Sequence, residues 1–170
     1  MTRNKTIDNS EDIIDSWDVI ARIYDLESER GGLVDAIESA KNELVEFETA
    51  HPEWALVGED SESREYLHDT LTNATEALTE WDESDEATEL KDLQALDNEA
   101  SGSGDWRHGE TLIRDTYFED YARQTAEDIG ALKDANHWPC TCIDWEKAAD
   151  ELKQDYTSVE FGDTTYWIRS

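Results

Sequence analysis

Residues 117–156 have the sequence YFEDYARQTAEDIGALKDANHWPCTCIDWEKAADELKQDY, the most distinctive residue pattern in the chain. Apolar residues recur at helical spacing up to Gly130, and a second helical pattern follows Asp144. We expect Gly130 to end the first helix in a left-handed conformation and Asp144 to cap the second. The expected apolar positions are Leu112, Ile113, Phe118, Ala122, Ala126 and Ile129 in the first helix, and Trp145, Ala148, Ala149, Leu152 and Tyr156 in the second.

The C-terminal residues show a different period. Val159 to Phe161 and Thr165 to Ile168 alternate in polarity on either side of Gly162-Asp163. Alternation around a glycine-containing turn is typical of two antiparallel strands. The sequence therefore predicts a small C-terminal β-hairpin.

Upstream of residue 100 the chain has the pattern of acidic amphipathic helices. Ile13, Trp17, Ile20 and Tyr24 share one helical face, and Gly31-Gly32 is expected to break that helix. A second apolar run follows and is expected to end at His51-Pro52. We predict that the two segments form an antiparallel helical hairpin with a heptad-like seam. The second run consists of Leu33, Ile37, Ala40, Leu44 and Phe47.

A third helix is predicted with Asp60 or Ser61 as its N-cap and an apolar seam of its own. The segment from Asp82 to Glu99 is expected to be either a weaker helix or a mobile acidic arm. Residues 101–104, Ser-Gly-Ser-Gly, have the composition of a flexible link. We therefore expect an acidic helical region at 1–100 and a C-terminal domain at 105–170, in a mainly α protein whose helical hairpin or bundle packs on a compact C-terminal unit. The third seam consists of Leu67, Leu71, Ala74, Leu78 and Trp81.

Charge limits the possible partners. The chain has 44 Asp and Glu against 14 Lys and Arg, and its formal net charge is -30. Residues 1–100 carry 29 acids and seven bases, whereas 101–170 carry 15 acids and seven bases. Such a surface repels phosphates within a Debye length of about 8 Å, so we expect no direct nucleic-acid binding. A basic protein surface is the expected partner.

The remaining sequence features suggest a protein without catalytic chemistry. Seven Trp and six Tyr favour a folded chain over an acidic tail. No apolar run approaches the ~20 residues of a membrane span, and we expect no membrane binding and a cytoplasmic location. No phosphate loop, nucleophile elbow or zinc-helix motif occurs, so we expect no enzyme activity, no catalytic residue and no cofactor.

Two cysteines require a separate interpretation. Cys140 and Cys142 are too close in sequence for an ordinary disulfide, so we expect free thiols. Together with His137, and with His108 as a distant fourth ligand, they could bind a soft metal. The spacing is not that of a standard zinc site, and we favour small buried thiols beside a core Trp138-Pro139 turn. No metal is expected.

The C-terminal part of the chain resembles the ArdA antirestriction proteins, which are acidic DNA mimics carried by mobile elements. The family pattern begins with a helix that has a Tyr-Ala or Ala-Arg pair and acidic residues and runs to Ile-Gly or Thr-Gly. A loop with proline, a Tyr-Ile-Asp-aromatic segment, an Ala-Arg-Asp-Leu-like helix and a closing aromatic strand follow. The matching residues are Tyr121-Ala122-Arg123, Glu127-Asp128-Ile129-Gly130, Pro139, Cys142-Ile143-Asp144-Trp145, Ala149-Asp150-Glu151-Leu152, Phe161 and Tyr166-Trp167-Ile168.

The resemblance implies a DNA-mimic inhibitor from a phage or mobile element. Its expected partner is a basic DNA-binding protein of the host, such as a restriction–modification enzyme or a CRISPR effector, in the host cytoplasm. The resemblance also implies a homodimer. The large aromatic residues available for such a contact are Trp106, Tyr117, Phe118, Tyr121, Trp138, Trp145 and Trp167.

Helical spacing suggests which carboxylates form the mimic surface, because acids three or four residues apart lie about 5–6 Å from one another. The alternative is a halophilic or phage accessory protein whose acidic surface serves only solvation. The candidate partner-binding residues are Asp15, Asp18, Asp25, Glu29, Glu65, Asp69, Glu76, Glu80, Asp82, Glu83, Asp85, Glu86 and Glu89.

Overall fold

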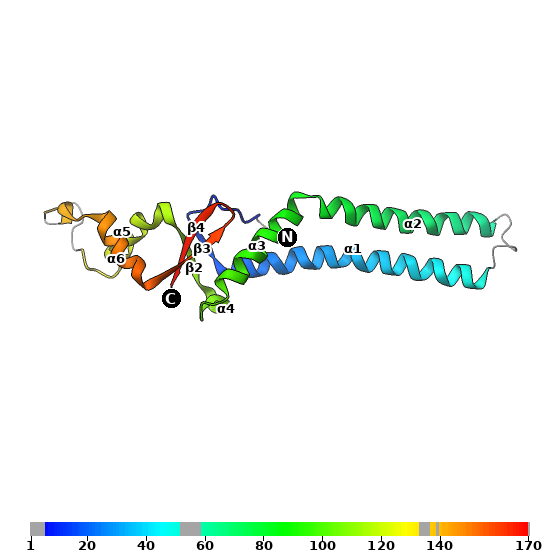
Figure 1. Ribbon diagram of the computed structural model, residues 1–170, viewed down its shortest axis with the longest axis horizontal. Coiled ribbons are helices and arrows are strands. Elements are labelled where there is room, and N and C mark those ends of the chain that lie inside the picture. Colours follow the sequence, from blue (N-terminus) through cyan, green and yellow to red (C-terminus); the bar gives the residue numbers. More distant parts are fainter. Residues whose placement is uncertain (1–5, 52–58, 133–136, 139, 170) are drawn as a thin grey trace. The chain divides into compact units, whose positions relative to one another are not determined.

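The computed structural model describes residues 6–51, 59–132, 137–138 and 140–169 (Figure 1). As expected, these residues are mainly helical with a small antiparallel sheet. The regular elements are β1 (Ile13–Asp15), α1 (Ser16–Ala50), α2 (Glu59–Asp82), α3 (Asp85–Ala100), α4 (Trp106–Gly109), β2 (Thr111–Arg114), α5 (Phe118–Asp128), α6 (Trp145–Leu152), β3 (Tyr156–Phe161) and β4 (Thr164–Arg169). Short 3-10 turns lie at Asp115–Tyr117, Cys140–Cys142 and Lys153–Asp155.

The chain forms two compact units. The sheet unit comprises Met1–Ile23 and Lys91–Ser170, and the hairpin unit comprises Tyr24–Leu90. Residues 101–104, the expected link between domains, therefore fall inside the sheet unit, where they form a turn. A fragment starting at residue 105 would lack Leu93 and Leu96, which are fully buried, and the strand β1. Whether 1–100 and 105–170 are separate domains stays a prediction.

The sheet has the strand order β1-β2-β4-β3, with every neighbouring pair antiparallel. The predicted β3-β4 hairpin is confirmed, and Gly162 takes a φ of +61 in its turn. The strands β1 and β2 were not predicted. Ile13, Leu112 and Ile113 had been assigned to helices, which is wrong. Strands of three and four residues are too short to show a period of two, so their apolar residues were counted into helical patterns.

Both faces of the sheet are buried. Ile113 is paired with Trp167 and faces a core that also contains Phe118, Ala122 and Ala149 of α5 and α6. The neighbouring Leu112 points to the opposite face, as do Tyr166 and Ile168, and all three are buried. Figure 1 shows α5 and α6 on one side of the strands and the end of α3 on the other.

The two helix boundaries predicted around this core are confirmed. Gly130 has a φ of +72 just beyond α5. The side chain of Asp144 accepts a hydrogen bond from the backbone N–H of Lys147 at 3.1 Å, which caps α6. Tyr156, expected on α6, instead begins β3.

The predicted break at Gly31-Gly32 is wrong, because α1 runs without interruption from Ser16 to Ala50. Neither glycine has a positive φ, and a Cβ atom at either position would meet no atom within 4 Å. Two glycines cost a helix only about 1 kcal/mol each relative to alanine. The long apolar seam of α1 outweighs that cost.

The apolar face predicted for the start of this helix is also wrong. Trp17 and Tyr24 are 55% and 71% exposed, while Val19 and Leu26 are buried. The seven-residue pattern of the predicted seam at Leu33 to Phe47 extends backwards through Arg30 and Leu26 to Val19. This continuity was not recognised from the sequence for two reasons. Arg30 is a polar residue at a seam position, and the helix was expected to end at Gly31-Gly32.

The helical hairpin is formed by α1 and α2, and not by two halves of α1. Its predicted seams are confirmed: Ala40, Leu44 and Trp81 are buried, and the other seam residues are partly buried. The helix α2 begins at Glu59, so neither Asp60 nor Ser61 is its N-cap. Residues 54–57 and Pro52 lie outside the described residues.

The segment from Asp82 to Glu99, for which a weak helix and a mobile arm were both considered, is mostly the helix α3. Its sparse leucines explain this, since Leu90, Leu93 and Leu96 are all buried. Three large apolar side chains on one face are enough to fix a short helix against a core.

The glycines provide a first test. We expect Gly31→Ala and Gly32→Ala each to stabilise the protein by about 0.5–1 kcal/mol, because the positions are helical and open. Gly109→Ala is the matched control. Gly109 has a φ of +96, and a Cβ atom there would lie 2.5 Å from Nε1 of Trp17, so this variant should be destabilised. Urea unfolding followed by circular dichroism measures all three. Destabilisation by the first two substitutions would show that α1 requires glycine at positions 31 and 32.

Candidate functional site

The negative charge is concentrated on the hairpin unit. Residues 24–90 contain 21 acids and three bases, which gives a net charge of -18. The sheet unit is longer, with 23 acids and 11 bases, and its net charge is -12. The hairpin is thus the more acidic part of the molecule and the first place to look for a cation-binding or basic-protein-binding surface.

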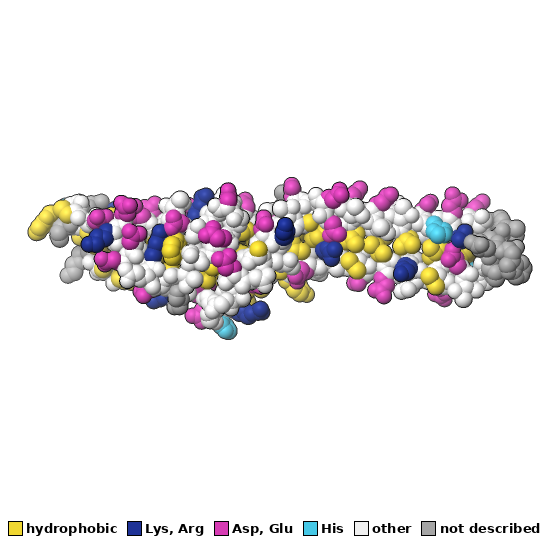
Figure 2. Space-filling model, in the orientation of Figure 1, with side chains coloured by type: hydrophobic (Ala, Val, Ile, Leu, Met, Phe, Trp, Pro, Cys, Tyr) yellow, Lys and Arg dark blue, Asp and Glu magenta, His cyan; other side chains and the backbone are white. Residues whose placement is uncertain are grey.

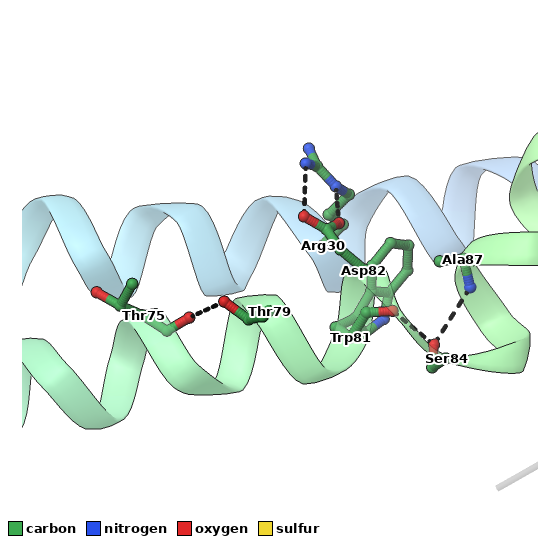
Figure 3. A network of polar contacts seen from close by, with 7 residues as sticks. All are labelled: Arg30, Thr75, Thr79, Trp81, Asp82, Ser84 and Ala87. Atoms are coloured by element: carbon green, nitrogen blue, oxygen red, sulfur yellow. Dashed lines mark hydrogen bonds and ion pairs between the residues drawn. The ribbon is translucent and has the colours of Figure 1, made fainter.

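Two ion pairs show the register of the hairpin. Arg30 donates from Nε to Oδ1 of Asp82 at 2.8 Å and from Nη2 to Oδ2 at 3.3 Å (Figure 3). Arg64 donates from Nε to Oε1 of Glu48 at 2.9 Å. The partners are 18 residues apart on both helices, so α1 and α2 run antiparallel in constant register for about 27 Å.

Asp82 is therefore not a free carboxylate. Its hydrogen bonds and its charge raise the pKa of the Arg30 guanidinium. Trp81 and Ser84 lie beside this pair at the end of α2, where Ser84 donates to the carbonyl of Trp81 at 2.6 Å and accepts from the N–H of Ala87 (Figure 3). Thr79 donates to the carbonyl of Thr75 at 3.0 Å, and three more threonines of α2 make the same bond one turn back. The threonine hydroxyls of this helix are thus bonded within it.

The heptad positions divide the hairpin into two faces. On one side of the seam, Glu48 of α1 lies next to His68 of α2, whose Nε2 is 3.6 Å from Glu48 Oε1. Lys41 lies on the same side of α1, one heptad before Glu48. This mixed face also contains Arg30 and Arg64. It therefore holds all three Lys and Arg residues of the hairpin unit.

The opposite side of the seam is the acidic face. Its charged residues are all carboxylates: Asp25, Glu29, Glu43 and Glu46 from α1 and Glu80 from α2. All of them are exposed except Asp25, which is partly buried. Small and polar residues such as Ala36, Ser63 and Thr70 lie between them.

The structure brings only part of the predicted surface together. Asp25, Glu29 and Glu80 lie on the acidic face, and Asp69 and Glu76 lie on the outer ridge of α2. Glu65 and Asp82 belong to the mixed-face side of α2. The sequence-based set of candidate residues did not include Glu43 and Glu46. Their heptad positions relative to the Leu33 to Phe47 seam place them on the same side as Glu29, and this pattern could have revealed them. Glu83, Asp85, Glu86 and Glu89 lie at the start of α3 or just before it, where acids favour the positive end of the helix dipole.

Asp15 and Asp18 belong to the sheet unit. The carboxylate of Asp15 accepts the N–H of Trp17 at 2.7 Å, and Asp18 lies in the first turn of α1. Ser16, which is fully buried, accepts the N–H of Glu110 at 2.7 Å through its hydroxyl. These residues anchor the start of α1 to β2, so Asp15 has a structural role whatever it binds.

The sheet unit contains one notable cluster around a lysine. Lys153 Nζ lies 2.6 Å from Oδ1 of Asp115 and 4.9 Å and 5.2 Å from the ring centres of Trp167 and Phe118. Trp167 Nε1 donates to the same oxygen at 2.7 Å. These hydrogen bonds, that of Lys153 first, lower the pKa of the Asp115 carboxyl.

Two tyrosines of the sheet, Tyr156 on the face of this cluster and Tyr166 on the opposite face, are held in their neutral form. Burial, followed by the hydrogen bond to Tyr121 at 3.2 Å, raises the pKa of the Tyr156 hydroxyl. Burial also raises the pKa of Tyr166 to about 12, and its hydroxyl donates to the carbonyl of Glu11 at 2.6 Å. Neither group is prepared to act as a base near neutral pH.

The cysteines do not form the buried turn that we favoured. Both are free, Cys140 is partly buried, and Cys142 and Trp138 are exposed. Pro139 lies outside the described residues. Within the part of the chain that the structure describes, no three His, Cys, Asp or Glu side chains are placed to hold a metal ion. Over the same residues, no helix is both long enough and apolar enough to span a membrane.

One open depression of about 590 Å³ lies on the hairpin. It is lined by Phe47, Glu62, Ser63, Tyr66 and Leu67. Phe47 stacks on His51 with ring centres 4.3 Å apart. The polar side chains of its lining are the carboxylate of Glu62 and the hydroxyls of Ser63 and Tyr66.

Comparisons with known proteins found no matching family model, no matching curated protein and no matching solved structure. The resemblance to ArdA proteins thus stays a prediction.

The Lys153 cluster gives a pH-dependent prediction. Because the folded pKa of Asp115 is lowered, its stabilisation is present above the unfolded value of about 3.9 and is lost as pH falls through the folded value. We expect Asp115→Asn to be less stable than the parent protein near neutral pH, with the difference shrinking in acid. Urea unfolding followed by tryptophan fluorescence at about pH 7 and about pH 3 measures this. Asp120→Asn, at an exposed position of α5, is the control, and an equal loss at both pH values would contradict the assignment.

Proposed function

We propose that the protein is a DNA-mimic inhibitor from a phage or mobile element. In this proposal it occupies the DNA-binding surface of a host defence protein, of the restriction–modification or CRISPR type, and excludes DNA by electrostatic competition. No covalent chemistry is involved. The observation that carries the proposal is the division of the hairpin into faces: every Lys and Arg of the unit lies on one side, and the charged residues of the other side are all carboxylates.

Charge density supports this function. The hairpin helices carry eight carboxylates between residues 24 and 50 and eight between 59 and 82. At 1.5 Å per residue the longer helix segment extends about 40 Å, so carboxylates occur about every 2.5 Å along the pair. Duplex DNA has one charge per about 1.7 Å. Because these segments also carry Arg30, Lys41 and Arg64, their net charge of -13 corresponds to about one charge per 3 Å, roughly half the charge density of a duplex.

The constant register of the helices is a second support. A mimic must present its charges in a fixed arrangement, because flexible charges lose conformational entropy when they bind. The apolar seam holds α1 and α2 at one register, with which the Arg30–Asp82 and Arg64–Glu48 pairs agree, and this keeps the acidic face as one surface. The resemblance of residues 117–168 to ArdA proteins is a further, independent support.

Groups of carboxylates, and not single ones, should determine inhibition, because an exposed ion pair contributes only about 0–1 kcal/mol. The test combines Glu29→Gln, Glu43→Gln, Glu46→Gln and Glu80→Gln. The matched control combines Glu119→Gln, Glu146→Gln, Glu151→Gln and Asp150→Asn on exposed positions of α5 and α6. Each set changes the formal charge from -30 to -26.

The readout is displacement of a labelled DNA duplex from a purified restriction–modification enzyme, followed by fluorescence anisotropy over a salt series. We expect the acidic-face variant to lose about tenfold or more in inhibition at low salt, with a shallower salt dependence. The control should lose much less. A larger loss in the control would place the functional surface on the sheet unit, and complete loss from any single substitution would indicate a catalytic or metal site.

The solvation alternative predicts a different response to salt. An acidic halophilic protein loses structure in dilute buffer, whereas the apolar seam and the sheet core described above should keep this protein folded. We expect the same helical circular dichroism at about 0.1 M and about 2 M salt, where the Debye length falls from about 10 Å to less than 3 Å. Loss of the helical signal in the dilute buffer would favour the solvation alternative.

A further inference from the structure

The mixed face of the hairpin carries the exposed apolar residues of α1, whereas Tyr66 of α2, which is 70% exposed, lies on the acidic side. Three large hydrophobic residues of α1 are exposed within the hairpin unit: Tyr24 at 71%, Val34 at 41% and Val45 at 54%. Their heptad positions place all three on the side of Lys41 and not on the side of Glu43. Exposed apolar residues that share one helix side form a patch, and such patches on folded proteins are commonly interaction sites.

The seam beneath this face is incompletely covered. Leu33 and Ile37 of α1, and Leu67, Leu71 and Leu78 of α2, are only partly buried. Figure 2 shows the result on the face that it presents, where a band of hydrophobic side chains follows the hairpin together with Lys, Arg and His, and carboxylates lie mainly along its margins. An apolar seam of this kind is normally covered by further helices, as in a four-helix bundle.

We propose that the mixed face binds the mixed face of a second copy of this chain, so that two hairpins form a four-helix bundle. The charges identify the occupant. This face carries both signs of charge, because its cations share it with more carboxylates. The cations are Arg30, Lys41 and Arg64, and the carboxylates are Glu27, Glu38, Glu48, Glu65 and Asp82. A surface that carries both signs can pair with itself across a two-fold axis, whereas two acidic faces repel each other.

Other partners fit this face less well. A basic protein gains more from the acidic face, where no cation of the hairpin opposes it. A nucleic acid would be repelled by the net charge of the whole chain. The dimer leaves both acidic faces outside, so it goes beyond the proposed function without depending on it.

The face is large enough for a stable dimer. Antiparallel helices of about 24 residues extend about 36 Å, and two helices with axes 8–10 Å apart are about 20 Å wide. A face of roughly 700 Å² on each copy is close to the ~800 Å² per partner of a standard interface.

The response to salt distinguishes this dimer from the inhibition proposed above. Two chains of charge -30 repel each other, so salt should strengthen their association by screening, whereas salt should weaken binding to a basic protein. Failure of the one proposal is therefore distinguishable from failure of the other.

The test is sedimentation equilibrium of the full chain at about 0.1 M and about 1 M salt, where the Debye lengths are about 10 Å and 3 Å. The disrupting variant combines Val34→Glu and Val45→Glu. Its matched control combines Ala36→Glu and Ser39→Glu, which adds the same two charges to exposed positions on the other side of α1. We expect a dimer whose association constant rises about tenfold or more with salt, a monomeric disrupting variant at both salts, and a control that still dimerises at high salt.

A second variant tests the same face without changing an apolar residue, so that an effect on folding can be recognised. Lys41→Glu replaces an exposed cation of the mixed face without touching the seam, and it should weaken dimerisation most at low salt. Helical circular dichroism of each variant should match that of the parent protein, since glutamate favours helix at least as well as valine or lysine does. A monomeric parent protein at both salts, or a dimer unaffected by the two valine substitutions, would overturn the proposal.

Discussion

The seven-residue apolar period of α1 is the constraint on which the structure depends. It starts at Val19 in the sheet unit and continues through Leu26, Ala40 and Leu44 in the hairpin unit, all of which are buried. One continuous helix therefore supplies packing residues to both compact units. Because packing and not intrinsic propensity stabilises most protein helices, this seam maintains α1 across two adjacent glycines.

The same period separates the charges. Once the seam is fixed, each carboxylate of α1 has a defined side, and Glu29 and Glu43 fall opposite Lys41. Arg30 has a seam position in the heptad but is exposed, and it pairs with Asp82 of α2. The surface proposed for a basic partner and the surface proposed for a second copy thus follow from one helical register.

The sheet unit shows how distant segments cooperate. The strand β1 comes from the N-terminus, β2 from the middle of the chain and β4 from its end, and each pairs with the next. Trp106 is fully buried and donates through Nε1 to Asp97 at 2.6 Å, which ties the turn after α3 to that helix. The carboxylate of Glu99 in α3 accepts the backbone N–H of Glu160 in β3 at 3.3 Å. These long-range contacts place residues 91–104 within the sheet unit, although their composition alone suggests an arm and a link.

The sequence by itself determined the features that depend on near neighbours. These are the mainly helical class, the seam from Leu33 to Phe47, the cap at Asp144, the glycine end of α5 and the β3-β4 hairpin, each encoded within a few residues. Only the tertiary structure decided what depends on distant partners. The strands β1 and β2 are too short to show a period and exist because they pair with each other and with β4. Likewise, the choice between the acidic and mixed faces required the register of α2 against α1, which ion pairs between residues far apart in the sequence show. Local propensity cannot encode such a register, because it is a property of two helices packed together and not of either one alone.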